Sequence, residues 1–135
     1  MDLRIATDVS ATGLRAQSLR MRVIAENLAN ADSVARTAGG DPYRRRLVVF
    51  APDAGAGDAG TGVKVRAITA DSSAFGRVYQ PGHPAADAQG YVKQPNVNGL
   101  VETADMRAAQ RAYEANLNAI EAARGMTMRT IDLIK

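Results

Sequence analysis

The chain has 135 residues, of which 46% are hydrophobic, and this size and composition suit one folded domain with a modest core. It contains no cysteine, which excludes disulfides and thiol chemistry, and no apolar run approaches the roughly 20 residues of a membrane span. The formal net charge of +3 arises in the middle of the chain, because acidic and basic residues balance within residues 1–33 and within residues 100–135. Helices that read DNA or RNA usually concentrate Lys and Arg on one face, so this balance argues against nucleic-acid binding.

Residues 3–31 are predicted to form the first helix. Its apolar residues recur close to a 3.6-residue period, at Leu3, Ala6, Leu14, Met21, Ile24 and Leu28. Gly13 interrupts this pattern, which indicates either the close approach of another backbone or a local break in the helix. Polar residues crowd the end of the segment, and Gly39-Gly40-Asp41-Pro42 then predicts a turn.

The middle of the chain, residues 34–97, is predicted to be rich in short strands. Candidate strands lie at residues 43–51, 63–68 and 76–80, and the connections between them contain many Gly, Pro and Asp residues. Hairpins are therefore favoured over parallel strands, and residues 52–62 are predicted to be a flexible, Gly-rich loop. Arg44, Arg45 and Arg46 fall inside the first candidate strand, where neighbouring side chains point to opposite faces. A partly solvated edge is favoured over a site for phosphate or an acidic partner.

Several fragments of the middle segment imitate catalytic or cofactor motifs. Gly55, Gly57 and Gly60 have the G-x-G-x-x-G spacing of the dinucleotide-binding motif. A strand pattern follows them, however, where that motif needs a helix. His83 is the only histidine and stands between Gly82 and Pro84, which indicates a rigid turn rather than a metal ligand. We therefore predict no enzyme activity and no catalytic, cofactor-binding or metal-binding residues.

Residues 98–135 are predicted to form a second long helix, because the segment is rich in alanine and free of proline. Larger apolar residues form one stripe along it, from Met106 to Ile134. About 34 helical residues would reach roughly 50 Å, longer than a domain of this size can cover, so part of the stripe is expected to face another helix or chain. Asn116, beside the stripe, either fixes the helix register through a buried hydrogen bond or is simply exposed.

Charged residues on this second helix alternate in sign at three-residue spacing. Arg111 precedes Glu114, and Glu121 precedes Arg124. Such neighbours are expected to pair along a solvated helix, each pair contributing a few tenths of a kcal/mol. The predicted fold class is therefore α+β: long terminal helices packed as an antiparallel, coiled-coil-like pair, with a small β-rich middle segment.

The amino-acid sequences of these segments resemble those of the flagellar rod and hook protein family. Ala16-Gln17, Arg20 and the run from Val23 to Ser33 are similar to the amino-terminal signature of that family. Further similar segments follow in order: Pro42-Tyr43-Arg44, Tyr79–Pro84 with Ala86-Asp87, Gly90–Val92, Pro95–Val97, Glu102, Asp105-Met106, Ala109, Arg111 and Tyr113–Asn116. The matches cover nearly the whole chain, and together they are highly specific.

The resemblance implies a structural subunit of the proximal rod of the bacterial flagellar basal body. Residues 1–33 and 98–135 would form the core domain of the rod, packing into an axial tube that transmits torque, while residues 34–97 would form the outer surface. The implied partners are copies of the chain, other rod proteins, and basal-body ring and export-gate components, with no nucleic acid, cofactor or membrane insertion. The implied location is the rod that crosses the periplasm, reached by type III export without a cleaved signal peptide.

The residues expected at the assembly interface lie on the apolar stripes or directly beside them. They are Leu14, Ile24, Asn27, Leu28, Asn30, Met106, Tyr113, Asn116, Leu117, Ile120 and Ile131. Two other interpretations remain open. The chain could be another axial subunit of the same family, or, from a different class, a basic nucleic-acid-binding or adaptor module.

Overall fold

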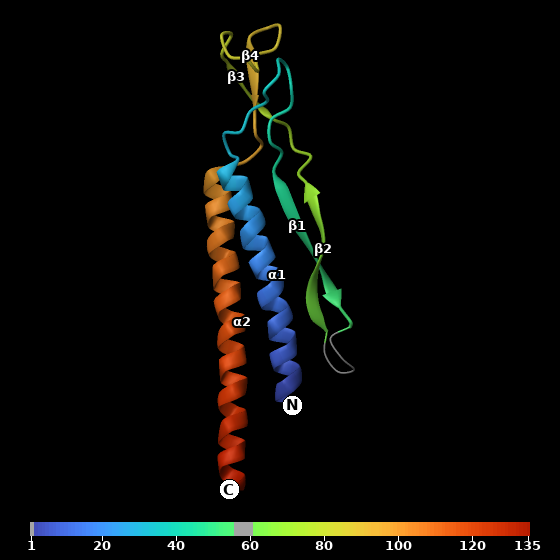
Figure 1. Ribbon diagram of the computed structural model, residues 1–135, viewed down its shortest axis with the longest axis vertical. Coiled ribbons are helices and arrows are strands. Elements are labelled where there is room, and N and C mark those ends of the chain that lie inside the picture. The colour runs from blue at the N-terminus through green and yellow to red at the C-terminus, as the bar shows by residue number, and fades with distance from the viewer. Residues whose placement is uncertain (1, 56–60) are drawn as a thin grey trace. The chain divides into compact units, whose positions relative to one another are not determined.

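A computed structural model describes residues 2–55 and 61–135 of the chain (Figure 1). Two helices enclose the rest of the sequence, α1 at Leu3–Ala29 and α2 at Gly99–Ile134. Four strands lie between them: β1 at Arg46–Asp53, β2 at Gly62–Ala70, β3 at Gly76–Tyr79 and β4 at Tyr91–Gln94. The predicted α+β class is confirmed, and the bounds of both helices agree with the predicted ones to within two residues.

The strands form two separate two-stranded sheets, one of β1 with β2 and one of β3 with β4. The second sheet is antiparallel, and its register pairs Gly76 with Gln94 and Tyr79 with Tyr91. Strand β4 was not predicted. Its four residues include one buried side chain, Val92, so no alternating pattern is long enough to indicate a strand. Two glycines of the predicted flexible loop, Gly57 and Gly60, lie outside the described residues.

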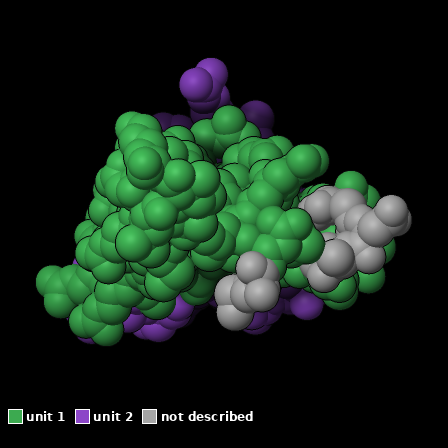
Figure 2. All heavy atoms as spheres, turned by 90° about the horizontal axis from the view of Figure 1, so that it is seen from below, with its two compact units in different colours: residues 1–22, 48–67, 106–135 green, residues 23–47, 68–105 purple. Residues whose placement is uncertain are grey.

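The chain divides into two compact units, coloured separately in Figure 2. Unit 1 comprises residues 1–22, 48–67 and 106–135, and unit 2 comprises residues 23–47 and 68–105. Each unit therefore contains a part of α1, of α2 and of the strands. The predicted assignment of residues 1–33 and 98–135 to a rod core, with residues 34–97 as a separate middle segment, stays a prediction.

Small residues hold the helices of unit 1 together. The parts of α1 and α2 in this unit lie side by side and run in opposite directions (Figure 1), which confirms the predicted antiparallel pair. The buried apolar side chains of the unit are Ala16 from α1 and Ala109, Ile120 and Ala123 from α2. Because three of the four are alanines, the backbones can approach closely, but each contact buries little apolar surface.

Thr12 ties the strands of unit 1 to α1. Its buried hydroxyl donates a hydrogen bond to the carbonyl oxygen of Val9 at 2.7 Å and accepts one from the backbone N–H of Val63 at 3.0 Å. Gly62 lies against the same side chain, and a Cβ at that position would be 2.7 Å from the Thr12 hydroxyl oxygen. The start of β2 therefore needs a glycine to reach the helix.

Within unit 1, α2 continues beyond the start of α1 (Figure 1). Leu3, Arg4 and Thr7 line a groove with Arg124, Thr127 and Met128, so the first turns of α1 lie level with this part of α2. The helix then continues to Ile134, six residues or about 9 Å further at 1.5 Å per residue. This projecting end carries exposed apolar side chains among polar ones: Ile131 is 44% exposed and Ile134 80%, and Met128, where the projection begins, is 58% exposed.

Unit 2 has a small apolar core and a tight hairpin. Its buried aliphatic side chains are Val23, Ile24, Ala85 and Val92, and Pro42 and Pro95 are buried as well. In the hairpin, the rings of Tyr79 and Tyr91 pack edge to face with centroids 5.3 Å apart. Asp87 organises the connection, because its Oδ1 accepts the backbone N–H groups of Tyr91 at 3.0 Å and Gln89 at 2.9 Å. These bonds, that of Tyr91 first, lower the pKa of the Asp87 carboxyl, aided by Arg77.

Candidate assembly interface

Gly13 lies against the side chain of Asn116 in the helix pair of unit 1. The helix α1 runs through Gly13 without a break, so the predicted local break is wrong; a close approach does occur at Gly13, but not by the predicted backbone. The approaching group is a side chain instead of a backbone: a Cβ on Gly13 would lie 2.6 Å from Asn116 Oδ1. The amide Nδ2 of Asn116 donates to the Ala112 carbonyl oxygen of its own helix at 2.8 Å, and the side chain is half-buried. The complementary shapes of glycine and asparagine therefore align α1 with α2 at this level.

Two predicted interface residues meet in a surface depression beside this contact. Leu14 of α1 and Tyr113 of α2 line it together with Ser18, Leu19 and two arginines, Arg15 and Arg22. The depression has a volume of about 380 Å³ and opens to solvent. Its floor is mainly apolar and its charged groups are both basic, so it suits an apolar side chain flanked by acidic ones.

The remaining predicted residues of unit 1 divide between the core and the surface. Ile120 is buried, with 9% exposed, and Met106 is half-buried. Leu117 and Ile131 are 40% and 44% exposed. Leu117 and Ile131 thus retain apolar surface that residues 2–55 and 61–135 leave uncovered, whereas Ile120 already contributes to the fold of the subunit.

The predicted residues of unit 2 lie within the chain or partly at its surface. Ile24 is buried with 5% exposed, and Leu28 is half-buried. Asn30 is half-buried and makes local bonds, since its Nδ2 donates to the Glu26 carbonyl oxygen at 2.9 Å and its Oδ1 accepts the Ser33 hydroxyl at 3.0 Å. Asn27 is 1% exposed, which places its polar group inside the protein.

All four hydrogen-bonding positions of the Asn27 amide are occupied within unit 2. Its Nδ2 donates to the Arg46 carbonyl oxygen at 2.9 Å and to Glu102 Oε2 at 3.1 Å. Its Oδ1 accepts the hydroxyl of Tyr43 at 2.8 Å and the backbone N–H of Arg46 at 3.0 Å. An asparagine amide has two donors and two acceptor positions, so Asn27 is fully satisfied. It joins the end of α1 to the start of β1 and to the first turn of α2.

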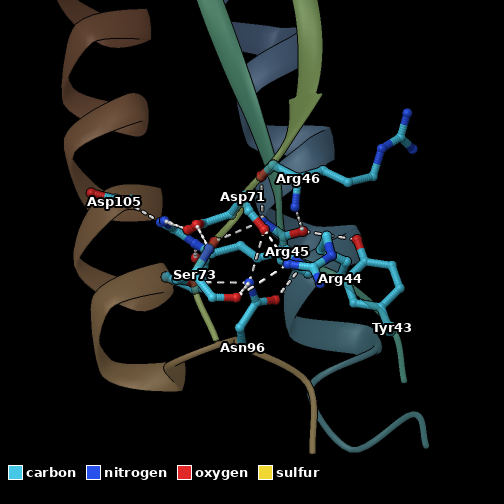
Figure 3. A network of polar contacts seen from close by, with 10 residues as sticks. Tyr43, Arg44, Arg45, Arg46, Asp71, Ser73, Asn96 and Asp105 are labelled. Atoms are coloured by element: carbon cyan, nitrogen blue, oxygen red, sulfur yellow. Dashed lines mark hydrogen bonds and ion pairs between the residues drawn. The ribbon is translucent and has the colours of Figure 1, made fainter. Parts of the chain in front are cut away.

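Arg45 is the centre of a second group of polar contacts in unit 2 (Figure 3). Its guanidinium forms ion pairs with three carboxylates: Nε with Glu102 Oε1, NH1 with Asp71 Oδ2 at 3.3 Å, and NH2 with Asp105 Oδ2 at 3.3 Å. The side chains of Arg45 and Glu102 are only 17% and 1% exposed. Burial lowers the pKa of Arg45, but the hydrogen bond and charge of Glu102, and then those of Asp71, outweigh this effect and raise the pKa.

The prediction of an alternating, solvated arginine edge is therefore wrong. Strand β1 begins at Arg46, so Arg44 and Arg45 precede it and are free of the two-residue alternation. The guanidinium of Arg44 lies 4.1 Å from the centroid of the Phe75 ring and donates to the carbonyl oxygen of Asp71 at 2.8 Å. Only Arg46 is exposed, and it pairs with Glu26 at 3.1 Å.

Asn96 links Arg45 to Ser73 through hydrogen bonds of its side-chain amide. Its Oδ1 accepts the backbone N–H of Arg45 at 2.7 Å, and its Nδ2 donates to Ser73 Oγ at 3.0 Å. The backbone N–H and then the hydroxyl of Ser73 lower the pKa of Asp71, and Arg45 adds to this shift. Asp71 therefore remains ionised and available to the arginine.

Sequence reasoning missed this cluster because its members look ordinary one by one. The sequence singled out Glu102 and Asn96 only because they lie in segments similar to the rod and hook family. Arg45 was one of three arginines in a row. A signal did exist: Glu102 stands in the first turn of α2, directly after the apolar pair Leu100-Val101. That position does not reveal which arginine approaches it, because the two lie 57 residues apart.

His83 occupies the predicted turn. Its backbone N–H donates to the Gln80 carbonyl oxygen at 3.0 Å, and its Nδ1 accepts the N–H of Ala85 at 3.0 Å. Among residues 2–55 and 61–135, no group of three or more His, Cys, Asp or Glu side chains is placed to hold a metal ion. Neither helix, over the same residues, has the length and hydropathy needed to cross a membrane.

The amino-acid sequence matches those of known protein families. Residues 8–36 match the family model described as flagella basal body rod protein, and residues 88–133 match the one described as flagellar basal body rod FlgEFG protein C-terminal. The chain is 46% identical to the flagellar basal-body rod protein FlgC of Agrobacterium fabrum, with 98% of this chain and 96% of that protein aligned. The FlgC proteins of Salmonella typhimurium and Bacillus subtilis are 44% and 42% identical, over 93% and 95% of both chains. With such identity along almost its whole length, the chain belongs to the FlgC family of flagellar basal-body rod proteins.

Proposed function

We propose that this chain, a structural subunit of the flagellar basal-body rod, assembles by packing the apolar faces of α1 and α2 against copies of itself and other rod proteins. The observation that carries this proposal is the exposed apolar surface at the end of α2, from Met128, where the helix passes the start of α1, to Ile134. Met128, Ile131 and Ile134 recur every three residues, so they share one side of the helix, and each is at least 44% exposed.

The energetics of burial favour a partner for this surface. Covering a Leu, Ile or Met side chain contributes about 1.5–3 kcal/mol, so three such residues, together with Leu117, supply a substantial part of a stable contact. Contacts of this kind repeat in every subunit of an assembly with one symmetry rule. Side chains that are exposed in the single chain would then be buried in the rod.

The finer parts of the proposal follow from family membership. The chain occupies the proximal part of the rod, where it crosses the periplasm, and helps to transmit torque along the axis. Its outer contacts are with basal-body ring and export-gate components, and it reaches the rod by type III export. It works by shape and has no enzymatic role. The balanced charge of residues 1–33 and 100–135 supports protein partners over nucleic acid.

Genetic complementation tests this function. In cells that lack the native gene, the variant M128N/I131N/I134N should fail to restore motility, and isolated basal bodies should lack a completed rod. Because each of the three residues is at least 44% exposed, and only Met128 borders the groove with α1, the helix content of the purified variant should stay close to that of the original chain. The matched control R129Q/T130N/D132N changes three exposed polar residues of the same segment and should restore motility. Full motility with the asparagine variant would refute the proposed role of this surface.

A further inference from the structure

Two arginines stand seven residues apart on the outer surface of α1. Arg15 and Arg22 are exposed, and both line the depression that contains Leu14 and Tyr113. Seven residues of helix correspond to two turns, so the two guanidinium groups start about 10.5 Å apart along the axis. The ion pairs within residues 2–55 and 61–135 include neither arginine.

Two glutamates on α2 repeat this spacing. Glu114 and Glu121 are exposed and seven residues apart, and Leu117 lies between them with 40% of its surface exposed. The predicted pairs of Glu114 with Arg111 and of Glu121 with Arg124 are wrong, because neither is within ion-pair distance in the described part of the chain. Both acidic groups are consequently available to an external partner.

We propose that α2 of a second copy of this chain docks on the depression, with its Leu117 against Leu14, Leu19 and Tyr113 and its glutamates paired with the two arginines. This inference rests on the proposed assembly of the chain with copies of itself. The two helices of unit 1 are antiparallel, so copies that point in one direction present α2 to a neighbouring α1 in the antiparallel sense. In that orientation Glu121 faces Arg15 and Glu114 faces Arg22.

This pairing also defines an offset between copies. Inside one chain Gly13 lies opposite Asn116, which places Arg15 close to the level of Glu114. Moving Arg15 opposite Glu121 shifts the second copy by one heptad, about 10 Å along the helix axis. At zero offset Arg22 would instead meet Arg107, a pair of like charges that the offset avoids. The contact joins different surfaces of the two copies, so each copy can bind another in turn.

Charge reversal tests this pairing on the purified full chain by sedimentation velocity over a concentration series. The variants R15E/R22E and E114R/E121R should each weaken self-association by about tenfold or more, because two attractions become two repulsions. An equimolar mixture of the two variants should restore association, since each then offers the other a complementary surface. The quadruple variant R15E/R22E/E114R/E121R should also associate on its own.

The control R36E/R66E changes the net charge as much as R15E/R22E but at exposed arginines outside the depression, so it should associate like the original chain. A second measurement uses the absence of cysteine from the sequence. A chain with S18C mixed with a differently tagged chain with L117C should form a disulfide-linked pair of the two, whereas S18C mixed with T69C, an exposed position on β2, should not.

Three outcomes would overturn the inference. They are an original chain that stays monomeric at every concentration, a mixture of the two charge variants that fails to associate, and absence of the S18C–L117C product. The complementation experiment with the end of α2 uses other residues and reads motility. If the asparagine variant fails to restore motility while the charge and disulfide tests are negative, the proposed function stands and only this pairing is lost.

Discussion

Gly13 and Asn116 lie in contact between the two helices of unit 1, where the missing side chain of one residue provides the space for the amide of the other. A Cβ on Gly13 would be 2.6 Å from Oδ1 and 2.8 Å from Cγ of Asn116. A glycine inside a helix costs about 1 kcal/mol relative to alanine, so this contact explains why a costly residue stands in the middle of α1.

The coupling between Gly13 and Asn116 can be measured by a double-mutant cycle. G13A alone is expected to lower the free energy of unfolding by about 1 kcal/mol, because overpacking costs more than the gain in helix propensity. In the N116A background the same change should instead raise it by about 1 kcal/mol. Urea unfolding of the four proteins measures the coupling. The control G125A, where nothing lies within 4 Å of the added Cβ, should stabilise in either background.

Thr12 is expected to contribute through its hydroxyl group. The change T12V keeps the size of the side chain but leaves the Val63 N–H without its acceptor, which should cost about 1–3 kcal/mol of stability. T12S keeps the hydroxyl and loses one methyl group, for a cost of about 0.8 kcal/mol. Thermal unfolding should therefore rank the proteins as original chain, then T12S, then T12V. Equal loss in both variants would mean that packing, and not the hydrogen bond, holds β2 to α1.

Arg45 and Arg46 are neighbours with very different expected effects. R45M leaves Glu102 buried without its positive partner, which should lower the free energy of unfolding by about 3–5 kcal/mol. R46M removes only an exposed pair with Glu26 and should cost at most about 1 kcal/mol. Denaturant unfolding of the two variants and the original chain measures both changes in the free energy of unfolding. Similar values for both would contradict the buried cluster as a source of stability.

Acidification should destabilise the chain partly through Asp71. Its pKa in the folded protein is below the usual value of about 3.9, so folding is favoured by its ionised form. The stabilisation is fully present above about pH 4 and is lost as the pH falls from there through the folded pKa.

The variant D71N isolates this contribution, because its amide does not titrate. Melting temperatures measured between neutral pH and pH 2 should fall less steeply for D71N than for the original chain, while D71N should be the less stable protein at neutral pH. Parallel curves would show that Asp71 has no part in the acid sensitivity.

The helices and their apolar faces could be predicted from the sequence, because helical periodicity is a local property. Residues three or four positions apart share a face whatever the rest of the chain does, so the stripe from Met106 to Ile134 could be predicted from the sequence alone. The same stripe predicted exposed apolar surface, since α2 is longer than the α1 segment beside it. Local sequence patterns likewise carried the resemblance to the rod and hook family.

The polar interior depended on the tertiary structure. The amide of Asn27 meets Glu102 across 75 residues of sequence, and Arg45 meets Asp71 across 26. No periodic pattern links such positions, and the choice of Arg45 over its two neighbours follows from where β1 begins. The exposed face for neighbouring subunits is encoded locally, whereas the buried contacts that stabilise each subunit exist only once distant segments fold together.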